Sequence, residues 1–369
     1  MLDFELKLPH YIERIKSSGL PVLIYGMGNG ADKVIDLFRE NGIEILGITA
    51  SDDFVRGQIF RGFAVKKLSD FEKAFGDFII APAFGSCIPD VMNHIISLSE
   101  THRVIYPCVP VAGEEISDDG FFARNEEKIN RARSLFPGES RRVFEGYYNF
   151  ICSGELKYLL DITSEKEEIY KSFLRPDGRG AYVDIGAYTG DTIEEYLSFT
   201  GGKYDEIIAV EPDVKNMAKL IKKLEGYKNL TCVNKVCTSY TGEIEFASSA
   251  GRQSAVGPRG EKRECITLDE ICAGKDISYI KIDAEGEEMN ILKGAADTIR
   301  RCRPRLNIAV YHRFADAFEI PLLINEMDSS YRFEMRHHPY IPAWDTNLYA
   351  VSISLPLEGK GDRLRWMRC

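Results

Sequence analysis

Short apolar runs alternate with amphipathic stretches over the first hundred residues. The runs at 22–26, 43–49, 77–83 and 102–107 are typical of strands, and the segments between them space apolar residues as helices do. This alternation predicts a parallel sheet covered by helices on both faces. We therefore expect a small Rossmann-like α/β domain over residues 1–112.

A second alternating series occupies residues 179–369. Its predicted strands are 181–186, 204–212, 229–236, 277–286 and 306–312, and helical patterns include 289–301. Two further strand-like runs, 331–338 and 347–355, are joined by a short polar loop containing proline, which predicts a hairpin. The pattern favours a mostly parallel Rossmann-like sheet with one reversed strand.

Residues 113–178 lack the strand signal. Charged stretches with helical spacing, such as 118–136 and 139–151, replace it. Their apolar positions must be buried against other elements, so this segment is expected to be a helical connector between two α/β domains.

Composition narrows the class of protein. The 369 residues are 44% hydrophobic with a net charge of −10, which supports full cores and argues against a nucleic-acid partner. No apolar run reaches transmembrane length, and the charged N-terminus does not resemble a signal peptide. The nine cysteines form no C-x-x-C pair and are expected to be reduced. We expect a cytoplasmic protein without a membrane partner.

The sharpest motif is Val183-Asp-Ile-Gly-Ala-Tyr-Thr-Gly-Asp-Thr192, a predicted strand, glycine turn and helix start. Gly186 and Gly190 allow close approach of the backbone to a ligand. Asp184 and Asp191 would repel a diphosphate but suit a ligand that carries an ammonium and a sulfonium. The charges therefore favour S-adenosylmethionine over NAD as cofactor.

Further cofactor contacts are expected at the ends of the next two strands. Glu211, followed by Pro212, can accept hydrogen bonds from both ribose hydroxyls, as it would for NAD. Asn234 either reaches an adenine edge or caps a turn. The complete expected set is Asp184, Gly186, Tyr188, Thr189, Gly190, Asp191, Glu211, Pro212, Asn234 and Asp283.

A second motif, 279–295, contains a strand that ends in Asp283 and Glu285, before Gly286 turns the chain. Ligands of open α/β sheets bind beyond the carboxyl ends of the strands, so both acids are expected at the site of methyl transfer. They could instead bind a divalent cation. Because the sequence offers no clear third ligand, we assign no metal.

Together, VDIGAYTGDT, AVEP and IKIDAEGEEMNILKGA resemble the FkbM family of methyltransferases, and the likeness continues through ITLDEI, PRLNIAVYHRFAD and DTNLYAV. It covers roughly residues 181–355, with Tyr188 standing where many members carry Asn. The resemblance implies a class I methyltransferase fold, S-adenosylmethionine as donor, and an oxygen acceptor on sugars or secondary metabolites.

Transfer to a hydroxyl benefits from a general base. His312, at the end of a predicted strand, is the first candidate, although it could equally cap that strand or pack beneath a helix. Asp283 and Glu285 follow, as base or orienting groups. Candidate acceptor contacts, each with a structural alternative, are His337, His338, Trp344 and Asp345 near the hairpin, and Arg252, Arg259, Lys262 and Arg263 on a predicted loop at 248–264.

The first domain carries a second glycine motif, Gly26-Met-Gly-Asn-Gly-Ala31, which fits the dinucleotide pattern between a strand and a helix. The acids Asp52 and Asp53 lie slightly beyond the end of the next strand. This domain could bind a nucleotide or nucleotide sugar, or serve as a scaffold or dimerisation unit. The alternatives for the whole chain are an NAD(P)-dependent oxidoreductase, which would use this loop, and a non-catalytic scaffold. The expected partner is a small-molecule acceptor, and a homodimer is compatible with this reading.

Overall fold

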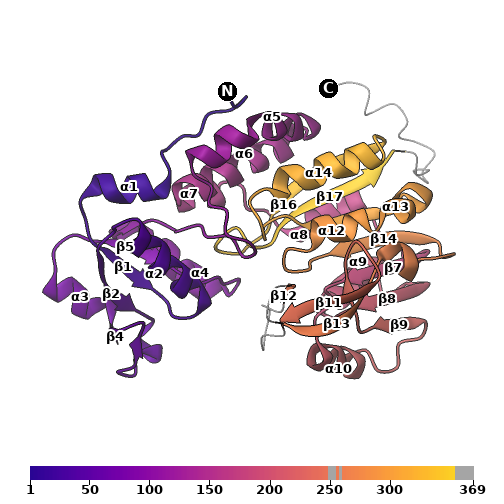
Figure 1. Cartoon of the computed structure of the whole chain (residues 1–369), viewed down its shortest axis with the longest axis horizontal. Coiled ribbons are helices and arrows are strands. Elements are labelled where there is room, and N and C mark those ends of the chain that lie inside the picture. The colour runs from indigo at the N-terminus through magenta and orange to yellow at the C-terminus, as the bar shows by residue number, and fades with distance from the viewer. Residues whose placement is uncertain (248–254, 257–259, 354–369) are drawn as a thin grey trace.

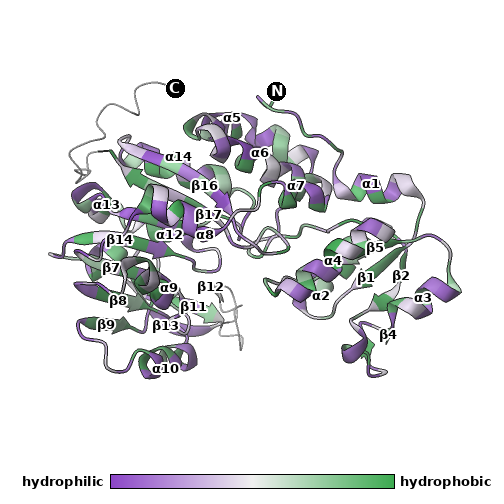
Figure 2. Ribbon diagram, turned by 180° about the vertical axis from the view of Figure 1, so that it is seen from behind, coloured by the Kyte–Doolittle hydropathy of each residue, from purple (hydrophilic) through white to green (hydrophobic). Residues whose placement is uncertain are grey.

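The computed structural model describes residues 1–247, 255–256 and 260–353 of the chain. Two α/β units lie side by side, and a group of helices connects them along one side (Figure 1). Apolar residues concentrate in the central strands, while many helices carry both hydrophilic and hydrophobic bands (Figure 2). This distribution is typical of sheets buried between amphipathic helices.

The N-terminal unit is built on a six-stranded sheet in the order β3-β4-β2-β1-β5-β6, parallel except for β3. Its strands are β1 (Val22–Tyr25), β2 (Ile45–Thr49), β3 (Ile59–Phe60), β4 (Phe63–Lys66), β5 (Ile79–Pro82) and β6 (Arg103–Val104). Its helices are α1 (Tyr11–Ser18), α2 (Asn29–Glu40), α3 (Leu68–Ala74) and α4 (Pro89–Thr101), with a 3₁₀ turn at Asp52–Phe54. The predicted alternation is confirmed, while the short β3–β4 hairpin was not anticipated.

Helices fill the segment between the two units. They are α5 (Asp119–Leu135), α6 (Gly138–Ser153), α7 (Leu156–Leu160) and α8 (Lys166–Ile169), followed by a π-helical turn at Tyr170–Leu174. Helix α5 packs on α14 (Asp316–Met327), and α6 packs on β16 (Tyr331–His337). The Tyr148 hydroxyl donates a hydrogen bond to the Phe314 carbonyl at 3.0 Å. The connector is therefore part of the C-terminal core.

The C-terminal sheet has seven strands in the order β16-β17-β15-β14-β7-β8-β9. The remaining strands are β7 (Ala181–Ile185), β8 (Glu206–Val210), β9 (Leu230–Val233), β14 (Ile277–Ile282), β15 (Arg305–Ala309) and β17 (Thr346–Ser352). Strand β17 runs antiparallel to both of its neighbours, so the mostly parallel sheet, its single reversed strand and the terminal hairpin are confirmed.

The helices of this unit depart from the prediction in two places. Those on the sheet are α9 (Asp191–Thr200), α10 (Val214–Lys223), α12 (Glu288–Lys293), α13 (Ala296–Cys302) and α14. The single helix predicted at 289–301 is broken at Gly294, where a Cβ atom would lie 2.5 Å from the Thr238 carbonyl oxygen. Helix α14, which contains Pro321, was missed.

A second, four-stranded sheet has the order β10-β13-β11-β12. Its strands are β10 (Val236–Cys237), β11 (Gly242–Ala247), β12 (Ala255–Val256) and β13 (Glu261–Ile266), and α11 (Leu268–Ile271) follows it. The prediction of a loop over 248–264 is thus wrong at residues 255–256 and from residue 261 onward, because β12 and β13 both pair with β11. Lys262 and Arg263 lie on this strand, whereas Arg252 and Arg259 lie outside the described residues.

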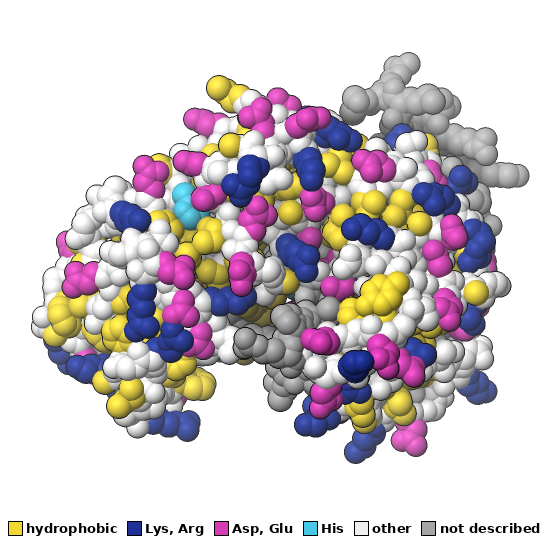
Figure 3. Space-filling view, in the orientation of Figure 1, with side chains coloured by type: hydrophobic (Ala, Val, Ile, Leu, Met, Phe, Trp, Pro, Cys, Tyr) yellow, Lys and Arg dark blue, Asp and Glu magenta, His cyan; other side chains and the backbone are white. Residues whose placement is uncertain are grey.

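The strand order places the first C-terminal strand, β7, between β8 and β14. The chain leaves β7 toward one side and later returns to the other, so the carboxyl ends of β7 and β14 flank the switch point where α/β sheets bind ligands. Among the described helices, none is both long and apolar enough to span a membrane. On the face in Figure 3, acidic and basic side chains are interspersed.

Candidate active site

A cavity of about 400 Å³ opens at the carboxyl ends of β7, β8 and β14. Both sequence motifs contribute to its walls, and so do the hairpin loop and two residues of the N-terminal unit (residues 1–112), Cys87 and Val111. The predicted cofactor and catalytic residues that line it are Gly186, Tyr188, Asp191, Glu211, Pro212, Asp283, Glu285 and His312. Its volume falls in the range of small-molecule sites.

The glycine turn after β7 brings the two motifs together. Gly186 has φ of +76°, and a Cβ atom there would lie 1.8 Å from the Asp283 carbonyl oxygen. Only glycine allows the ends of β7 and β14 to approach this closely. Gly190, with φ of +88°, precedes the first residue of α9. The turn thus exposes backbone beside Asp283 to the cavity.

Glu211 holds the glycine turn against the end of β8. Its two carboxylate oxygens accept hydrogen bonds from the backbone N–H groups of Tyr188 and Asp213, both at 2.9 Å. Burial raises the pKa of this carboxyl, while those hydrogen bonds oppose the shift. Because each carboxylate oxygen can accept a second hydrogen bond, Glu211 can still receive two hydroxyls from the cavity.

Four of the expected cofactor residues do not line the cavity. The Asn234 amide donates hydrogen bonds to the carbonyl oxygens of Glu211 and Pro212, at 2.7 and 3.1 Å. The amide nitrogen of Asn234 thus caps the turn that follows β8. The others outside the cavity lining are Asp184, Thr189 and Gly190.

Asp184 is fully buried and is paired with a lysine that the sequence analysis missed. The Lys281 Nζ lies 3.6 Å from Asp184 Oδ1 and 3.7 Å from Asp283 Oδ2, and Thr192 donates a 2.5 Å hydrogen bond to Asp184. Burial raises the pKa of Asp184. Burial would lower the pKa of Lys281, but the neighbouring carboxylates outweigh burial and raise it overall. Asp184 therefore does not present the free negative charge that we expected. A lysine within the apolar run YIKI was the available signal, because strands buried on both faces are normally apolar throughout.

The second lysine of the cavity is also compensated. Lys166 Nζ lies 3.0 Å from Glu195 and 3.2 Å from Asp345. The described residues that line the cavity include two lysines, Lys166 and Lys281, and no arginine. Each lysine is paired with two carboxylates. This charge balance provides no uncompensated cation for a diphosphate.

His312, at the end of β15, lies among three carboxylates. Its Nδ1 is 3.0 Å from Glu288 Oε1, and its Nε2 is 3.5 Å from Asp283 Oδ1 and 3.7 Å from Glu285 Oε2. Burial alone would lower the pKa of His312, but the carboxylates raise it to about 10. The ring is therefore protonated at neutral pH, whereas a general base must begin neutral. Glu288, fully buried on α12, was not recognised from the sequence.

The hairpin residues divide into two groups. Trp344 and Asp345 line the cavity. His337 and His338 do not: His337 contacts the Thr346 hydroxyl and the Tyr340 carbonyl, and His338 contacts the Ser164 carbonyl and the Tyr349 hydroxyl. Burial lowers the pKa of both imidazoles. These two histidines thus fit the structural alternative.

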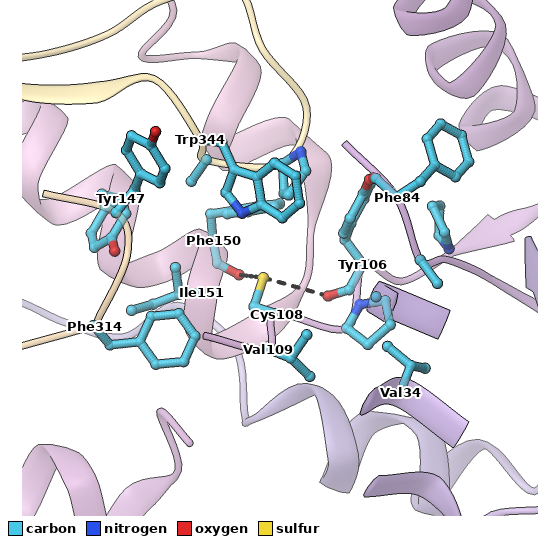
Figure 4. A pocket seen from close by; sticks show the side chains of 17 residues that line it. Val34, Phe84, Tyr106, Cys108, Val109, Tyr147, Phe150, Ile151, Phe314 and Trp344 are labelled. Carbon is cyan, nitrogen blue, oxygen red and sulfur yellow. Dashed lines mark hydrogen bonds between the residues drawn. The ribbon is translucent and has the colours of Figure 1, made fainter. Parts of the chain in front are cut away.

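The N-terminal glycine motif packs tightly against the end of β5. A Cβ atom at Gly30 would lie 2.5 Å from the Ala83 carbonyl oxygen, and one at Gly26 would lie 2.7 Å from the Phe84 ring. The cavity beside this turn is about 40 Å³ and has mainly apolar walls, with the Cys108 thiol directed at two backbone carbonyls (Figure 4). That volume is far below what a nucleotide needs.

Backbone contacts join the N-terminal half to the active-site loops. Ser86 and Ile341 exchange two hydrogen bonds, at 2.7 and 3.0 Å, and the Ala112 N–H donates to the His312 carbonyl at 2.9 Å. Gly85 is close to the hairpin loop, since a Cβ atom there would lie 2.5 Å from the Trp344 ring. The N-terminal half is therefore fixed directly against the candidate site.

Comparison with known proteins gives a family match within the C-terminal half. Residues 184–341 match the family model described as "Methyltransferase FkbM domain". A solved FkbM methyltransferase from Methylobacillus flagellatus KT is similar over nearly the whole chain: the TM-score is 0.71 at 19% identity, covering 93% of this chain and 94% of that one. At this identity the likeness shows a common fold.

Other solved structures match more weakly. An rRNA methylase from Streptococcus thermophilus has a TM-score of 0.32 at 14% identity, over 48% of this chain and 88% of that one. A fibrillarin from Aeropyrum pernix with natively bound S-adenosyl-L-methionine has a TM-score of 0.31 at 14% identity, over 48% of this chain and 68% of that one. A search of curated proteins gives no match.

Proposed function

We propose that the chain is a methyltransferase, because residues 184–341 match the FkbM methyltransferase domain model, and that it methylates a hydroxyl of a small, hydroxyl-rich acceptor such as a sugar. One observation carries the proposal. The glycine turn, Glu211 and the Asp283–Glu285–His312 group surround a single cavity of about 400 Å³ at the switch point of the sheet.

The charges and shape of the cavity fit S-adenosylmethionine. The turn at Gly186 and Tyr188 would hold the cofactor beside β7, and Glu211 would accept its ribose hydroxyls. Asp191 lines the same cavity and offers a carboxylate to a positively charged ligand. When bound, the cofactor supplies a methyl group that its sulfonium has already activated.

The opposite end of the cavity suits a polyhydroxylated acceptor. Asp283 and Glu285 offer carboxylate oxygens to hydroxyl groups, and the Tyr311 hydroxyl donates to Asp283 Oδ1 at 3.2 Å, fixing that carboxylate. The rings of Tyr340 and Trp344 provide apolar surface nearby. We assign to the two acids the acceptance of the hydroxyl proton, and to the charged ring of His312 the positioning of both acids.

The N-terminal unit completes the acceptor side of the cavity. Cys87 and Val111 line it, and the Ser86–Ile341 contact holds the hairpin loop in place. We propose that residues 1–112 act as a scaffold that shapes acceptor specificity. The connector at 113–178 would join this scaffold to the catalytic domain at 179–369.

The test is a mass-spectrometric search for addition of one methyl group to a panel of sugars and other hydroxylated compounds. With an acceptor in hand, Asp283→Asn and Glu285→Gln are each expected to lower turnover roughly 10²- to 10⁴-fold, the usual contribution of a proton-accepting group. The exposed Glu225→Gln variant is the matched control and keeps full turnover. Methylation confined to nitrogen acceptors, or full turnover in both acid variants, would refute this assignment.

A further inference from the structure

Trp344 lies at the boundary between two cavities. Its half-buried side chain lines the large cavity of about 400 Å³ and also the small apolar cavity of about 40 Å³ beside the N-terminal glycine motif. In Figure 4 the indole lies with Phe84, Tyr106 and Phe150 around the small cavity. One part of the ring is therefore packed in an apolar contact, while another part faces the space at the acceptor end of the large cavity.

Gly85 of the N-terminal unit sets the position of this ring. A Cβ atom on Gly85 would lie 2.5 Å from both Cε3 and Cζ3 of Trp344, and 3.0 Å from Cε1 of Tyr340. The φ of Gly85 lies outside the left-handed region, so the backbone conformation does not require glycine there. Glycine is required for space alone, because alanine at this position would push the indole away.

The loop that carries Trp344 is held on both sides. Ser86 and Ile341 exchange two backbone hydrogen bonds, at 2.7 and 3.0 Å, which join the loop to the N-terminal unit. On the other side, the carboxylate of Asp345 lies 3.2 Å from Lys166 Nζ. A ligand that packs on the ring therefore has little side-chain motion to restrict, and the entropic cost of its binding is reduced.

The surroundings of the ring combine apolar and charged surface. The Tyr340 ring lies beside Trp344, with centroids 5.9 Å apart, and the carboxylates of Asp283 and Asp345 line the same cavity. A pyranose ring has two matching surfaces, because its C–H groups form an apolar face and its hydroxyl groups project from the edge. Aromatic side chains bury apolar faces of this kind, and carboxylates accept hydrogen bonds from hydroxyls. The cavity thus suits a saturated, hydroxylated ring that lies on the indole.

We propose that Trp344 is the platform on which the ring of a pyranose acceptor stacks, and that Gly85 is the residue that positions this platform. The inference rests on the proposed function, because it names the residue that selects the acceptor of that reaction. It also gives the N-terminal unit a defined part in acceptor selection, since one glycine of this unit determines where the indole lies.

The test uses the fluorescence of Trp344 as a reporter. The chain has two tryptophans, Trp344 and Trp366, so Trp366→Phe leaves Trp344 as the single tryptophan of the full-length protein. This variant is titrated with a panel of methyl hexopyranosides, and with catechol as a flat aromatic comparison. We expect the emission of Trp344 to change with a glycoside and not with catechol.

Two glycine variants in the same background test the positioning role without any ligand. Gly85→Ala should shift the emission of Trp344, because the ring must move to make room for the added methyl group. Gly76→Ala is the matched control: it lies in the same unit, and an added Cβ atom there has no other atom within 4 Å. Its emission should equal that of the parent protein.

Calorimetry then compares the affinity of these proteins for the glycoside that gives the largest emission change. Trp344→Leu should weaken binding about 10-fold, since the geometry of an aromatic contact contributes up to roughly this factor beyond its apolar area. Trp344→Phe keeps an aromatic ring and should recover part of the loss. Gly85→Ala should also weaken binding, whereas Gly76→Ala should bind as the parent protein does.

Four results would overturn the proposal: no glycoside that changes the emission of Trp344, a response to catechol alone, undiminished affinity in Trp344→Leu, or the same emission in Gly85→Ala and Gly76→Ala. If circular dichroism shows that Gly85→Ala does not fold, the two Trp344 variants still test the stacking. Titration with S-adenosylhomocysteine on the same proteins separates the two proposals. Retained binding of this compound beside a failed glycoside titration refutes the platform alone, whereas no binding by wild type refutes the methyltransferase assignment.

Discussion

Replacing Lys281 with methionine should destabilise the C-terminal unit strongly. Lys281 is only 7% exposed and lies between Asp184, which is fully buried, and Asp283. Methionine preserves most of the side-chain volume but removes the positive charge. The two carboxylates would then face one another without compensation.

The expected magnitude follows from the burial of the pair. Removing one partner of a buried ion pair typically costs roughly 3–5 kcal/mol, because an uncompensated charge remains. Adding Asp184→Asn removes that charge and should recover about 0.5–3 kcal/mol, the usual coupling energy of residues in contact. Lys166→Met is the matched control: it also lies between two carboxylates, but its side chain is 31% exposed, so about 1 kcal/mol is expected.

The assay is denaturant unfolding, monitored by circular dichroism. It compares wild type, Lys281→Met, Lys166→Met and the Lys281→Met/Asp184→Asn double variant. We expect Lys281→Met to be the least stable of these four proteins. If it loses no more stability than Lys166→Met, or if Asp184→Asn gives no recovery, Lys281 does not neutralise the buried acid.

Two further substitutions test the glycine turn and the hairpin. Gly186→Ala should lower the free energy of unfolding by on the order of 3 kcal/mol and abolish cofactor binding, because the added methyl group would overlap the Asp283 carbonyl oxygen. The control Gly201→Ala, also at positive φ but with open space around it, should lower the free energy of unfolding by only about 1 kcal/mol in thermal unfolding. Equal losses would show that the close strand approach is unimportant. For His337, burial lowers the pKa from 6.5 to about 3. The unfolded chain therefore takes up a proton below about pH 6.5 that the folded one does not, so stability should fall on acidification by up to about 1.4 kcal/mol per pH unit. His337→Gln should reduce the pH dependence of the free energy of unfolding measured by urea melts. An unchanged pH dependence in this variant would contradict the role assigned to His337.

The sequence allowed the prediction of both α/β series because their strands are buried on both faces and their helices are amphipathic. Elements without that pattern were missed. Strand β13 reads Glu-Lys-Arg-Glu-Cys-Ile and forms only because β11 pairs with it, so its propensity is set by tertiary contact. Helix α14 contains Pro321, which argues locally against a helix.

The candidate site shows the same division. Residues at strand ends, such as Glu211 and Asp283, could be placed because parallel strands bring their carboxyl ends to one edge of the sheet. The residues that pair with the charged groups of the site could not be predicted in this way. Glu288 lies on a helix and Lys281 within a strand, and only the packed fold brings them to His312 and Asp184.

The most direct test of the methyltransferase assignment is calorimetric titration with S-adenosylhomocysteine, with NAD and NADP in parallel, on wild type, Glu211→Gln and the exposed control Glu225→Gln. We predict binding of S-adenosylhomocysteine alone, weakened about 10- to 100-fold by Glu211→Gln through loss of charged hydrogen bonds, and unchanged in the control. Tight binding of NAD or NADP without a response to S-adenosylhomocysteine would contradict the account.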